Sequence, residues 1–236
     1  MGTARRNSFP EACVDAHLVL AQTYGATLRY DEPVVSWRVT AMGCALVTGQ
    51  GEYRARQLLL TAGGWIASLV PELSLPFSVE RQVVVARFEP RARPERCFAP
   101  ARCPIHLWEV APQNFFYGFP DLGSGVKVAR HHAGEVADPD HIRREVATRS
   151  LRRYANWCGG FCPTRMAHCV RRRLCTCTNA PDEHFWIDRH PEQPRVMIAS
   201  PCSGHGFKFS SVIGEALAEL LISGQSRFDL SLFRKR

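Results

Sequence analysis

The sequence contains no long hydrophobic run. No stretch of about 18 consecutive apolar residues occurs, so no transmembrane helix is expected. The N-terminal residues MGTARRNSFPEACVDAH lack the apolar core of a signal peptide, and the C-terminal residues FRKR match no tail signal. With 45% hydrophobic and 22% charged residues, the composition is ordinary for a globular protein. We therefore expect a cytoplasmic protein that does not associate with membranes.

Paired C-x-x-C motifs of structural zinc sites are also absent, although the chain has ten cysteines. Without a secretory signal, a disulfide framework is a poor explanation for so many cysteines. A cysteine-rich stretch covers residues 158–177, and its potential metal ligands are Cys158, Cys162, His168, Cys169, Cys175 and Cys177. Because their spacing fits no zinc motif, we expect no metal site. A zinc module is kept as an alternative that metal analysis would test.

Acidic residues are outnumbered, since 22 Asp and Glu stand against 30 Lys and Arg, giving a net charge of +8. Basic runs at 151–154 and 171–174 offer positive charge to phosphate groups. No aromatic-interleaved basic motif accompanies them, so we expect no nucleic-acid binding and interpret the runs as a solvated arginine-rich face. A basic nucleic-acid module is a second alternative, to be tested by salt-dependent binding.

The expected elements begin with one helix followed by many strands. Residues 11–24 have helical spacing of apolar positions, and Gly25 follows where a helix C-terminal glycine would sit. The next strand-like runs are 26–30, 34–40, 44–49 and 53–65, and from about residue 78 the runs alternate like antiparallel strands. This order indicates a mixed fold, α/β with α+β character, and contains no internal repeat.

Two helices and a strand are expected in the second half. Residues 138–154 predict a helix that begins near Asp138 or Asp140. A short strand at 195–200 is followed by an amphipathic helix that ends at Gly224.

The loop ASPCSGHGFKFSS, residues 199–211, connects this last strand to the last helix. Ligands bind at such positions in open α/β sheets. The glycines would let the backbone approach a flat ring, and the helix N-terminus favours negative charge. Lys208 is therefore a candidate to meet a carboxylate. A plain glycine turn with an exposed lysine is the simpler alternative.

Several long segments, in order, resemble a known family. These are FYGFPDLGSGVKVARHHAGEVADPD, CTCTNAPDEHFWIDRHPE, SGHGFKFSSVIGEALAELL and FDLSLF. They are similar to monomeric sarcosine oxidase, N-methyltryptophan oxidase and related secondary-amine oxidases of the D-amino-acid oxidase superfamily. The resemblance covers nearly the whole chain from about residue 10 and is strongest in residues 115–140 and 175–233. It implies a D-amino-acid oxidase-like fold with FAD as cofactor.

One family motif has no counterpart here. Members open with a strand, a G-x-G-x-x-G turn and a helix that hold the FAD pyrophosphate. The sequence has no such fingerprint, and GQG at 49–51 does not qualify. The resemblance therefore implies that residues 1–77 form the later part of the FAD-binding domain. Residues 78–174 would form an antiparallel-sheet substrate domain, and 175–236 would return to the FAD-binding domain.

The resemblance assigns the flavin contacts to two segments. Cys175 stands seven residues before Asp182, where the family has the cysteine that forms a thioether to the 8α-methyl of FAD. Such a cysteine must be a thiolate, and Arg172 or Arg173 would help to lower its pKa. The glycine loop would lie against the flavin with Gly204, His205, Gly206, Phe207 and Lys208. Cys177 falls where the family often has a tyrosine.

Substrate and oxygen contacts are assigned to the segment GVKVARHHAG. In a regular strand Lys127, Ala129 and His131 share one face, and Lys127 lies roughly 13 Å from His131 along the strand. The resemblance makes Lys127 the cation that activates oxygen, where a fixed charge stabilises superoxide. His131, Tyr117 and Lys208 would face the substrate, with Lys208 on its carboxylate. An edge-strand lysine and a core tyrosine are the structural alternatives.

The resemblance implies oxidation of a secondary amine. A small N-methyl amino acid such as sarcosine would be converted to an imine, and oxygen would be reduced to hydrogen peroxide. We expect a monomer, or a chain that needs the missing N-terminal segment. A non-catalytic remnant that binds no flavin is the alternative, favoured by the missing fingerprint.

Overall fold

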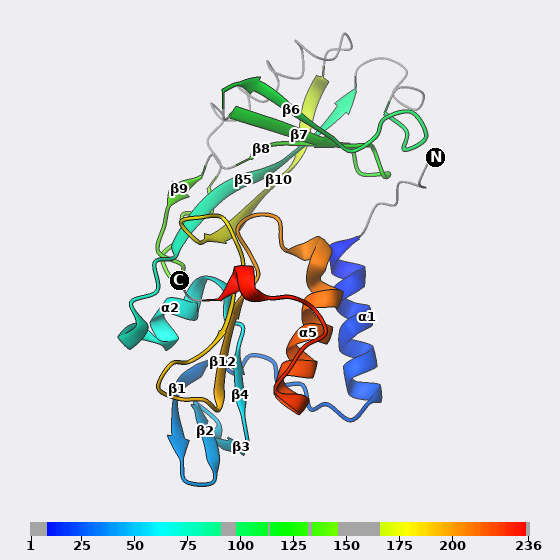
Figure 1. Ribbon diagram of the computed structural model, residues 1–236. Helices are drawn as coiled ribbons and strands as arrows, with labels where there is room; N and C mark the ends of the chain where they lie inside the picture. The colour runs from blue at the N-terminus through cyan, green and yellow to red at the C-terminus, as the bar shows by residue number, and fades with distance from the viewer. Residues whose placement is uncertain (1–8, 91–97, 113, 132–133, 146–165, 235–236) are drawn as a thin grey trace. The chain divides into compact units, whose positions relative to one another are not determined.

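The computed structural model describes residues 9–90, 98–112, 114–131, 134–145 and 166–234. The chain divides into two compact units, which are described separately. The first unit is Met1–Phe77 with Thr178–Arg236, and the second is Ser78–Cys177. Figure 1 shows the helices of the first unit and the strands of the second.

A small sheet organises the first unit. Strand β12 (Val196–Ser200) pairs antiparallel with β11 (Trp186–Arg189) and parallel with β4 (Leu58–Leu60). All five residues of β12 are buried, as is typical of a strand covered on both faces. Because side chains alternate along β12, it contributes to a different hydrophobic cluster on each face.

The two clusters draw on different parts of the chain. One joins Met197 and Ala199 of β12 to the last helix and to Phe185, and the other joins Val196 and Ile198 to the segment between β1 and residue 77. The strand expected at 26–30 does not form, since these residues have no regular structure. The run expected at 53–65 is divided between two strands and a helical turn.

The first half of this unit consists of a three-stranded antiparallel meander and short helical turns. Its elements are β1 (Val34–Thr40), β2 (Gly43–Thr48), β3 (Gly51–Ala55), η1 (Gly63–Trp65), α2 (Ile66–Leu69) and η2 (Pro71–Leu73). A Cβ at Gly43 would collide with the carbonyl oxygen of Ala55, so the close approach of β3 requires glycine there.

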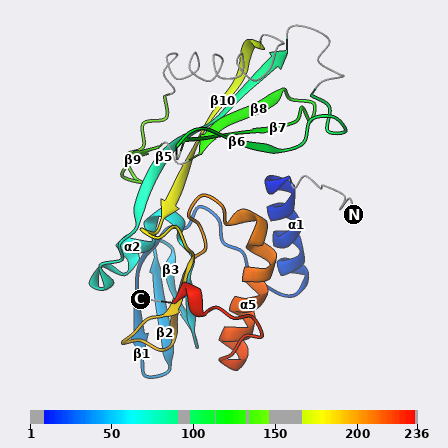
Figure 2. The same cartoon turned by 45° about the horizontal axis from the view of Figure 1, so that its top comes forward.

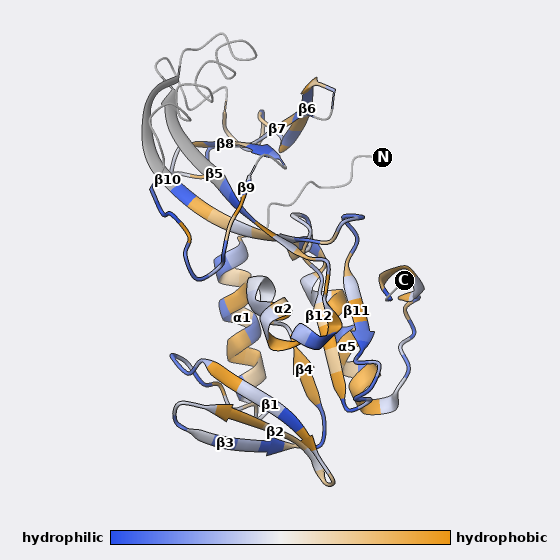
Figure 3. Cartoon of the chain, turned by 90° about the vertical axis from the view of Figure 1, so that its left-hand side faces the viewer, coloured by the Kyte–Doolittle hydropathy of each residue, from blue (hydrophilic) through white to orange (hydrophobic). Residues whose placement is uncertain are grey.

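Two helices of equal length lie side by side in the first unit (Figures 1 and 2). Helix α5 (Ser210–Ser223) buries Ile213, Ala216 and Leu217, which share one face, and ends at Gly224 with φ of +77°. Helix α1 (Pro10–Thr23) begins with proline and has no buried residue. Figure 3 shows hydrophobic residues interspersed with polar ones along α1. In the part of the chain that is described, no helix is long and apolar enough to cross a membrane.

The second unit is an antiparallel sheet. Its strands are β5 (Ser78–Pro90), β6 (His106–Ala111), β7 (Asn114–Phe119), β8 (Val126–His131), β9 (Glu135–Val136) and β10 (Met166–Asn179). The order is β10-β5-β8-β7-β6, with β9 beside β5. The last two residues of β10 belong to the first unit, so this strand leads the chain from one unit into the other.

The helix predicted over 138–154 is wrong for residues 138–145, which form a turn followed by a segment without regular structure. Buried Arg81 donates to the backbone carbonyls of Arg143 and Glu145, so both carbonyls accept a hydrogen bond from a side chain. The Asp138 carboxylate accepts from the Asp140 N–H at 2.9 Å. The rest of the predicted helix lies outside the described residues.

Candidate functional site

One face of the sheet in the second unit gathers three predicted site residues. In the β7–β8 register, Phe119 lies opposite Lys127 and Tyr117 opposite Ala129. Residues directly opposite each other project to the same face, so Tyr117, Lys127 and His131 share it. The rings of Tyr117 and His131 are edge to face with centroids 6.2 Å apart. The alternation of β8 thus brings these side chains together, from two adjacent strands.

Aromatic rings hold the Lys127 ammonium in place. Its Nζ lies 4.6 Å from the ring centroid of Phe119 and 5.8 Å from that of Tyr117. Both distances are within the range of cation–π attraction. Lys127 is half-buried, on a strand paired on both sides. It is therefore not an edge-strand lysine but a localised positive charge on an aromatic surface.

Cys175 and Cys177 lie two residues apart on β10, so their side chains project to the same face of the strand. A hydrogen bond from the Cys177 thiol, together with the positive charge of Lys127 and a backbone hydrogen bond at Thr176, lowers the pKa of Cys175 to about 6, while burial opposes the shift. Cys175 is exposed and Cys177 half-buried. At neutral pH Cys175 is therefore mostly a thiolate, the reactive form of cysteine.

The groups that lower this pKa differ from those expected. The sequence pointed to Arg172 or Arg173, whereas the contacts come from Cys177 and Lys127. The side chain of Arg172 lies outside the described residues, and Arg173 is exposed. The contact from Cys177 has a sequence signal, because two cysteines spaced two residues apart on a strand project to the same face. The approach of Lys127 depends on strand order in the sheet, which the sequence does not reveal.

The glycine loop of the first unit is fixed by Ser203. This residue is 1% exposed and adopts a left-handed conformation with φ of +45°. Its Oγ donates to the His184 carbonyl at 3.0 Å and accepts from the Ala180 N–H at 3.2 Å. Its own N–H donates to the Thr178 carbonyl at 2.8 Å. The loop is thereby tied to the end of β10 and to the segment that follows it.

The loop residues after Ser203 are held by packing. Gly204 has φ of +73°, which favours glycine. A Cβ at Gly206 would collide with the Pro201 carbonyl oxygen, so this position also requires glycine. The His205 ring packs on Phe185 with centroids 5.0 Å apart, and its Nε2 donates to the Glu183 carbonyl at 3.0 Å. His205 thus has a structural role in the loop.

Phe207 and Lys208 open the short helical turn η3 (Phe207–Phe209) that leads into α5. Both side chains are exposed, and the Lys208 Nζ lies 5.1 Å from the ring centroid of Phe209. Lys208 is therefore accessible to an anionic group at the start of a helix, where negative charge is favoured. The structure places it in the first unit, and Lys127 in the second.

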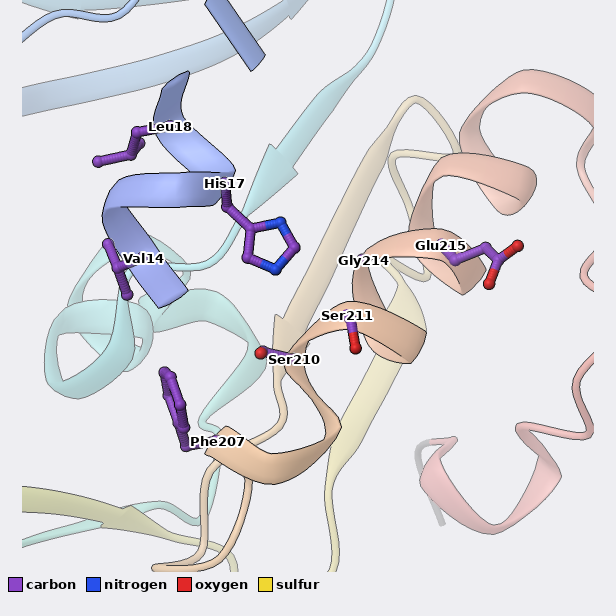
Figure 4. Close-up of a pocket in the computed structure, with 8 residues that line it drawn as sticks. All are labelled: Val14, His17, Leu18, Phe207, Ser210, Ser211, Gly214 and Glu215. Carbon is purple, nitrogen blue, oxygen red and sulfur yellow. The ribbon is translucent and has the colours of Figure 1, made fainter. Parts of the chain in front are cut away.

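A pocket of about 490 Å³ lies between α1 and α5 (Figure 4). The His17 imidazole extends from α1 into the space between the two helices, and Phe207 lies at one end near Val14. Its lining residues are Val14, His17, Leu18, Phe207, Ser210, Ser211, Gly214 and Glu215. Apart from Phe207, none of these was singled out from the sequence, because helix spacing does not show which helices lie side by side.

Asn179 has a buried side-chain oxygen that could accept a hydrogen bond from a cofactor. Its Oδ1 is buried and, within the described residues, has no hydrogen-bond partner. Such acceptors are rare in proteins and usually bind a group that is not in view. The next residue, Ala180, donates to Ser203 and so contacts the glycine loop. This buried acceptor and the closely packed glycine loop are features that fit a planar, hydrogen-bonding cofactor.

Comparison with known proteins defines the class. The sequence matches the family described as FAD dependent oxidoreductase over residues 8–220. The chain therefore belongs to the FAD-dependent oxidoreductase family, as its motifs predicted.

Particular relatives refine this placement. The chain is 37% identical over 231 residues to a monomeric sarcosine oxidase of Streptomyces avermitilis, covering 96% of this chain and 60% of that protein. It is 30% identical over 233 residues to an N-methyl-L-tryptophan oxidase of Salmonella arizonae, covering 95% of this chain and 59% of that protein. The chain thus spans about 60% of the length of these relatives.

Solved structures confirm the fold. NikD, described as an unusual amino acid oxidase essential for nikkomycin biosynthesis, matches with a TM-score of 0.79 at 23% identity, over 96% of this chain and 60% of that one. A thermally stable mutant of fructosyl peptide oxidase matches with a TM-score of 0.75 at 20% identity. The match covers 95% of this chain and 57% of that one. The predicted D-amino-acid oxidase-like fold is therefore correct.

Proposed function

We propose that this chain carries the substrate and oxygen side of a flavin-dependent amine oxidase. The substrate would be a small N-methyl amino acid, and the products an imine and hydrogen peroxide. The observation that carries the proposal is the shared face of the sheet, where Lys127, Tyr117 and His131 lie together. Family membership and the similarity to sarcosine oxidases support it.

FAD, when bound, supplies the acceptor for the hydride that leaves the carbon beside the amine nitrogen. Cys175 would hold the flavin through a thioether to its 8α-methyl, because its thiolate is already present at neutral pH. In the first unit, Asn179 Oδ1 offers a buried acceptor. The backbone at Gly204 and Gly206, with Phe207, offers a surface for a flat ring.

Lys127 would stabilise the negative charge that oxygen acquires on reduction. Its ammonium is already positioned by Phe119 and Tyr117, so little reorganisation is needed when charge develops. Tyr117 and His131, in edge-to-face contact, would line the space for a small amine. Lys208, exposed at the start of α5, would bind the substrate carboxylate.

Separate measurement of the two half-reactions tests this division of roles. Purified protein would be incubated with FAD and mixed with sarcosine without oxygen to follow flavin reduction. Oxygen would then be added to follow peroxide. For Lys127→Met we expect unchanged flavin reduction and about a hundredfold slower reoxidation. Lys127→Arg should restore part of the rate.

Arg130→Met is the matched control. Arg130 is the neighbouring cation on β8 that projects to the opposite face, where it donates to Asn114 at 2.8 Å. This variant should reoxidise at the normal rate. Equal loss of both half-reactions in Lys127→Met would contradict an oxygen-specific role.

A second candidate function is that of a non-catalytic relative that binds no flavin. It is the alternative that the sequence left open, because no G-x-G-x-x-G motif occurs among these 236 residues. No flavin bound or reduced in the same experiment, with FAD supplied in excess, would support this candidate against the oxidase.

A further inference from the structure

Leu107 of β6 lies on the face of the sheet that carries the predicted site residues of the second unit. The β6–β7 register places Leu107 directly opposite Tyr117, and the β7–β8 register continues this row to Ala129. Residues in such a row project to the same face, so Leu107 joins Tyr117, Lys127 and His131. Strand β6 is the last in the sheet order, which places Leu107 at the border of this face.

The neighbours of Leu107 along β6 confirm which face it occupies. The His106 ring lies over Gly118, because a Cβ at Gly118 would collide with the His106 Nε2. The centroid of the His106 ring lies 6.5 Å from that of Trp108 and 6.2 Å from that of Phe116. These rings gather on the opposite face of the sheet. Trp108 therefore adjoins Leu107 in sequence but projects away from the site.

Leu107 leaves much of its apolar side chain exposed. It is 58% exposed, whereas Ala129 in the same row is completely buried. Phe115 and Phe119 of β7 project to the same face and are half-buried. An apolar surface thus extends from the aromatic rings of β7 to Leu107. Single exposed leucines are common in proteins, so it is the position beside Tyr117 that makes this one informative.

The extent of this surface indicates the class of substrate. Sarcosine has no side chain on its α-carbon, so sarcosine held at Tyr117 and His131 would leave Leu107 in contact with water. An aliphatic side chain would cover Leu107, and the apolar surface removed from water would stabilise the complex. Glu109 shares this face, opposite Phe115, and its negative charge would disfavour an acidic side chain.

We propose that Leu107 is a specificity-determining residue that contacts the substrate side chain. The preferred substrates are then N-methyl amino acids with an aliphatic side chain of the size of leucine. This inference rests on the proposed function, because it takes the face of Tyr117, Lys127 and His131 as the substrate side. It adds no chemical step to the oxidation.

Binding measurements test the proposal without depending on turnover. Purified protein with FAD in excess would be titrated without oxygen, once with sarcosine and once with racemic N-methylleucine, and each Kd measured by ligand-observed NMR. N-methylleucine should bind about tenfold more tightly or better, because one methylene in an apolar site is worth about tenfold or more. In Leu107→Ala the two Kd values should come within about threefold of each other, with that of sarcosine unchanged.

Trp108→Ala is the matched control. Trp108 is the next residue of β6 and is exposed to a similar extent, 52%, but projects to the opposite face. This variant should keep the preference for N-methylleucine. Leu107→Met should also keep it, because methionine is apolar and similar in volume to leucine.

Equal Kd values for the two amines in the unmodified protein, or no binding of N-methylleucine, would overturn the proposal. A preference that survives in Leu107→Ala would overturn it as well. Flavin reduction in the same samples tests the proposed function separately. Reduction by sarcosine without any preference for N-methylleucine would contradict the specificity alone. Reduction by neither amine would contradict the oxidase, while the ratio of the two Kd values would still decide the role of Leu107.

Discussion

The Cys177 thiol donates a hydrogen bond to the Cys175 sulfur from two residues away on the same face of β10. This contact, assisted by Lys127 on β8, lowers the pKa of Cys175 to about 6. Burial has the opposite effect on Cys202, whose pKa is raised above its usual value. The protein thus contains one cysteine, Cys175, that is mostly a thiolate at neutral pH, and another, Cys202, that is a protonated thiol.

Cys175 should react with iodoacetamide in a pH-dependent manner that Cys202 does not share. A lowered pKa means that the thiolate is present above about pH 6 and is lost as the pH falls below it. Cys177→Ala should move the midpoint for Cys175 upward by removing the donor. Peptide-resolved alkylation rates between pH 5 and 9 would measure this. An unchanged midpoint in Cys177→Ala would show that the thiol contact does not activate Cys175.

Gly206 and Gly214 should respond in opposite ways to alanine. A Cβ at Gly206 collides with the Pro201 carbonyl, so Gly206→Ala should destabilise the fold by about 1–3 kcal/mol. Gly214 lies inside α5 with open space around it, so Gly214→Ala should stabilise by about 0.5–1 kcal/mol through helix propensity. Urea unfolding of both variants measures the pair. A stable Gly206→Ala would show that the loop is not closely packed against Pro201.

Glu72 should contribute to stability in a pH-dependent way. His190, 2% exposed and packed edge to face against Trp37, contacts the Glu72 carboxylate at 2.8 Å. The hydrogen bond from His190 lowers the pKa of Glu72. A lowered carboxyl pKa gives stability that is present above the ordinary pKa and is lost as the pH falls through the folded-state pKa.

Glu72→Gln should therefore be less stable than the natural protein at pH 7, by up to about 1 kcal/mol because Glu72 is half exposed. The difference should narrow towards pH 4. Unfolding free energies at several pH values would show this, with exposed Glu192→Gln as the control. A difference in unfolding free energy that stays constant with pH would mean that the Glu72 carboxylate charge does not contribute to stability.

The parts of the fold that depend on local periodicity could be predicted from the sequence. Helix α5 was located by apolar spacing and by Gly224, whose positive φ ends the helix. Alternation along β8 placed Lys127 and His131 on one face, where the structure finds them. Family membership, predicted from motifs, is confirmed over residues 8–220.

Features that depend on tertiary contacts could not be predicted. The turn at 138–145 replaces a predicted helix because buried Arg81, more than 60 residues away in sequence, takes up two backbone carbonyls. The influence of Lys127 on Cys175 joins β8 to β10, which are separated by β5 in the sheet. Neither contact has a short-range sequence signal.

The most direct test of the proposed flavin chemistry is the visible absorption of the protein after incubation with FAD and acid precipitation. We predict that flavin absorption stays with the precipitated protein, is lost in Cys175→Ala, and is retained in Cys202→Ala, because the pKa of Cys175 is lowered to about 6 whereas burial raises the pKa of Cys202. Absence of flavin from both the native and the precipitated protein, with FAD in excess, would contradict the oxidase and leave a relative that does not bind the cofactor.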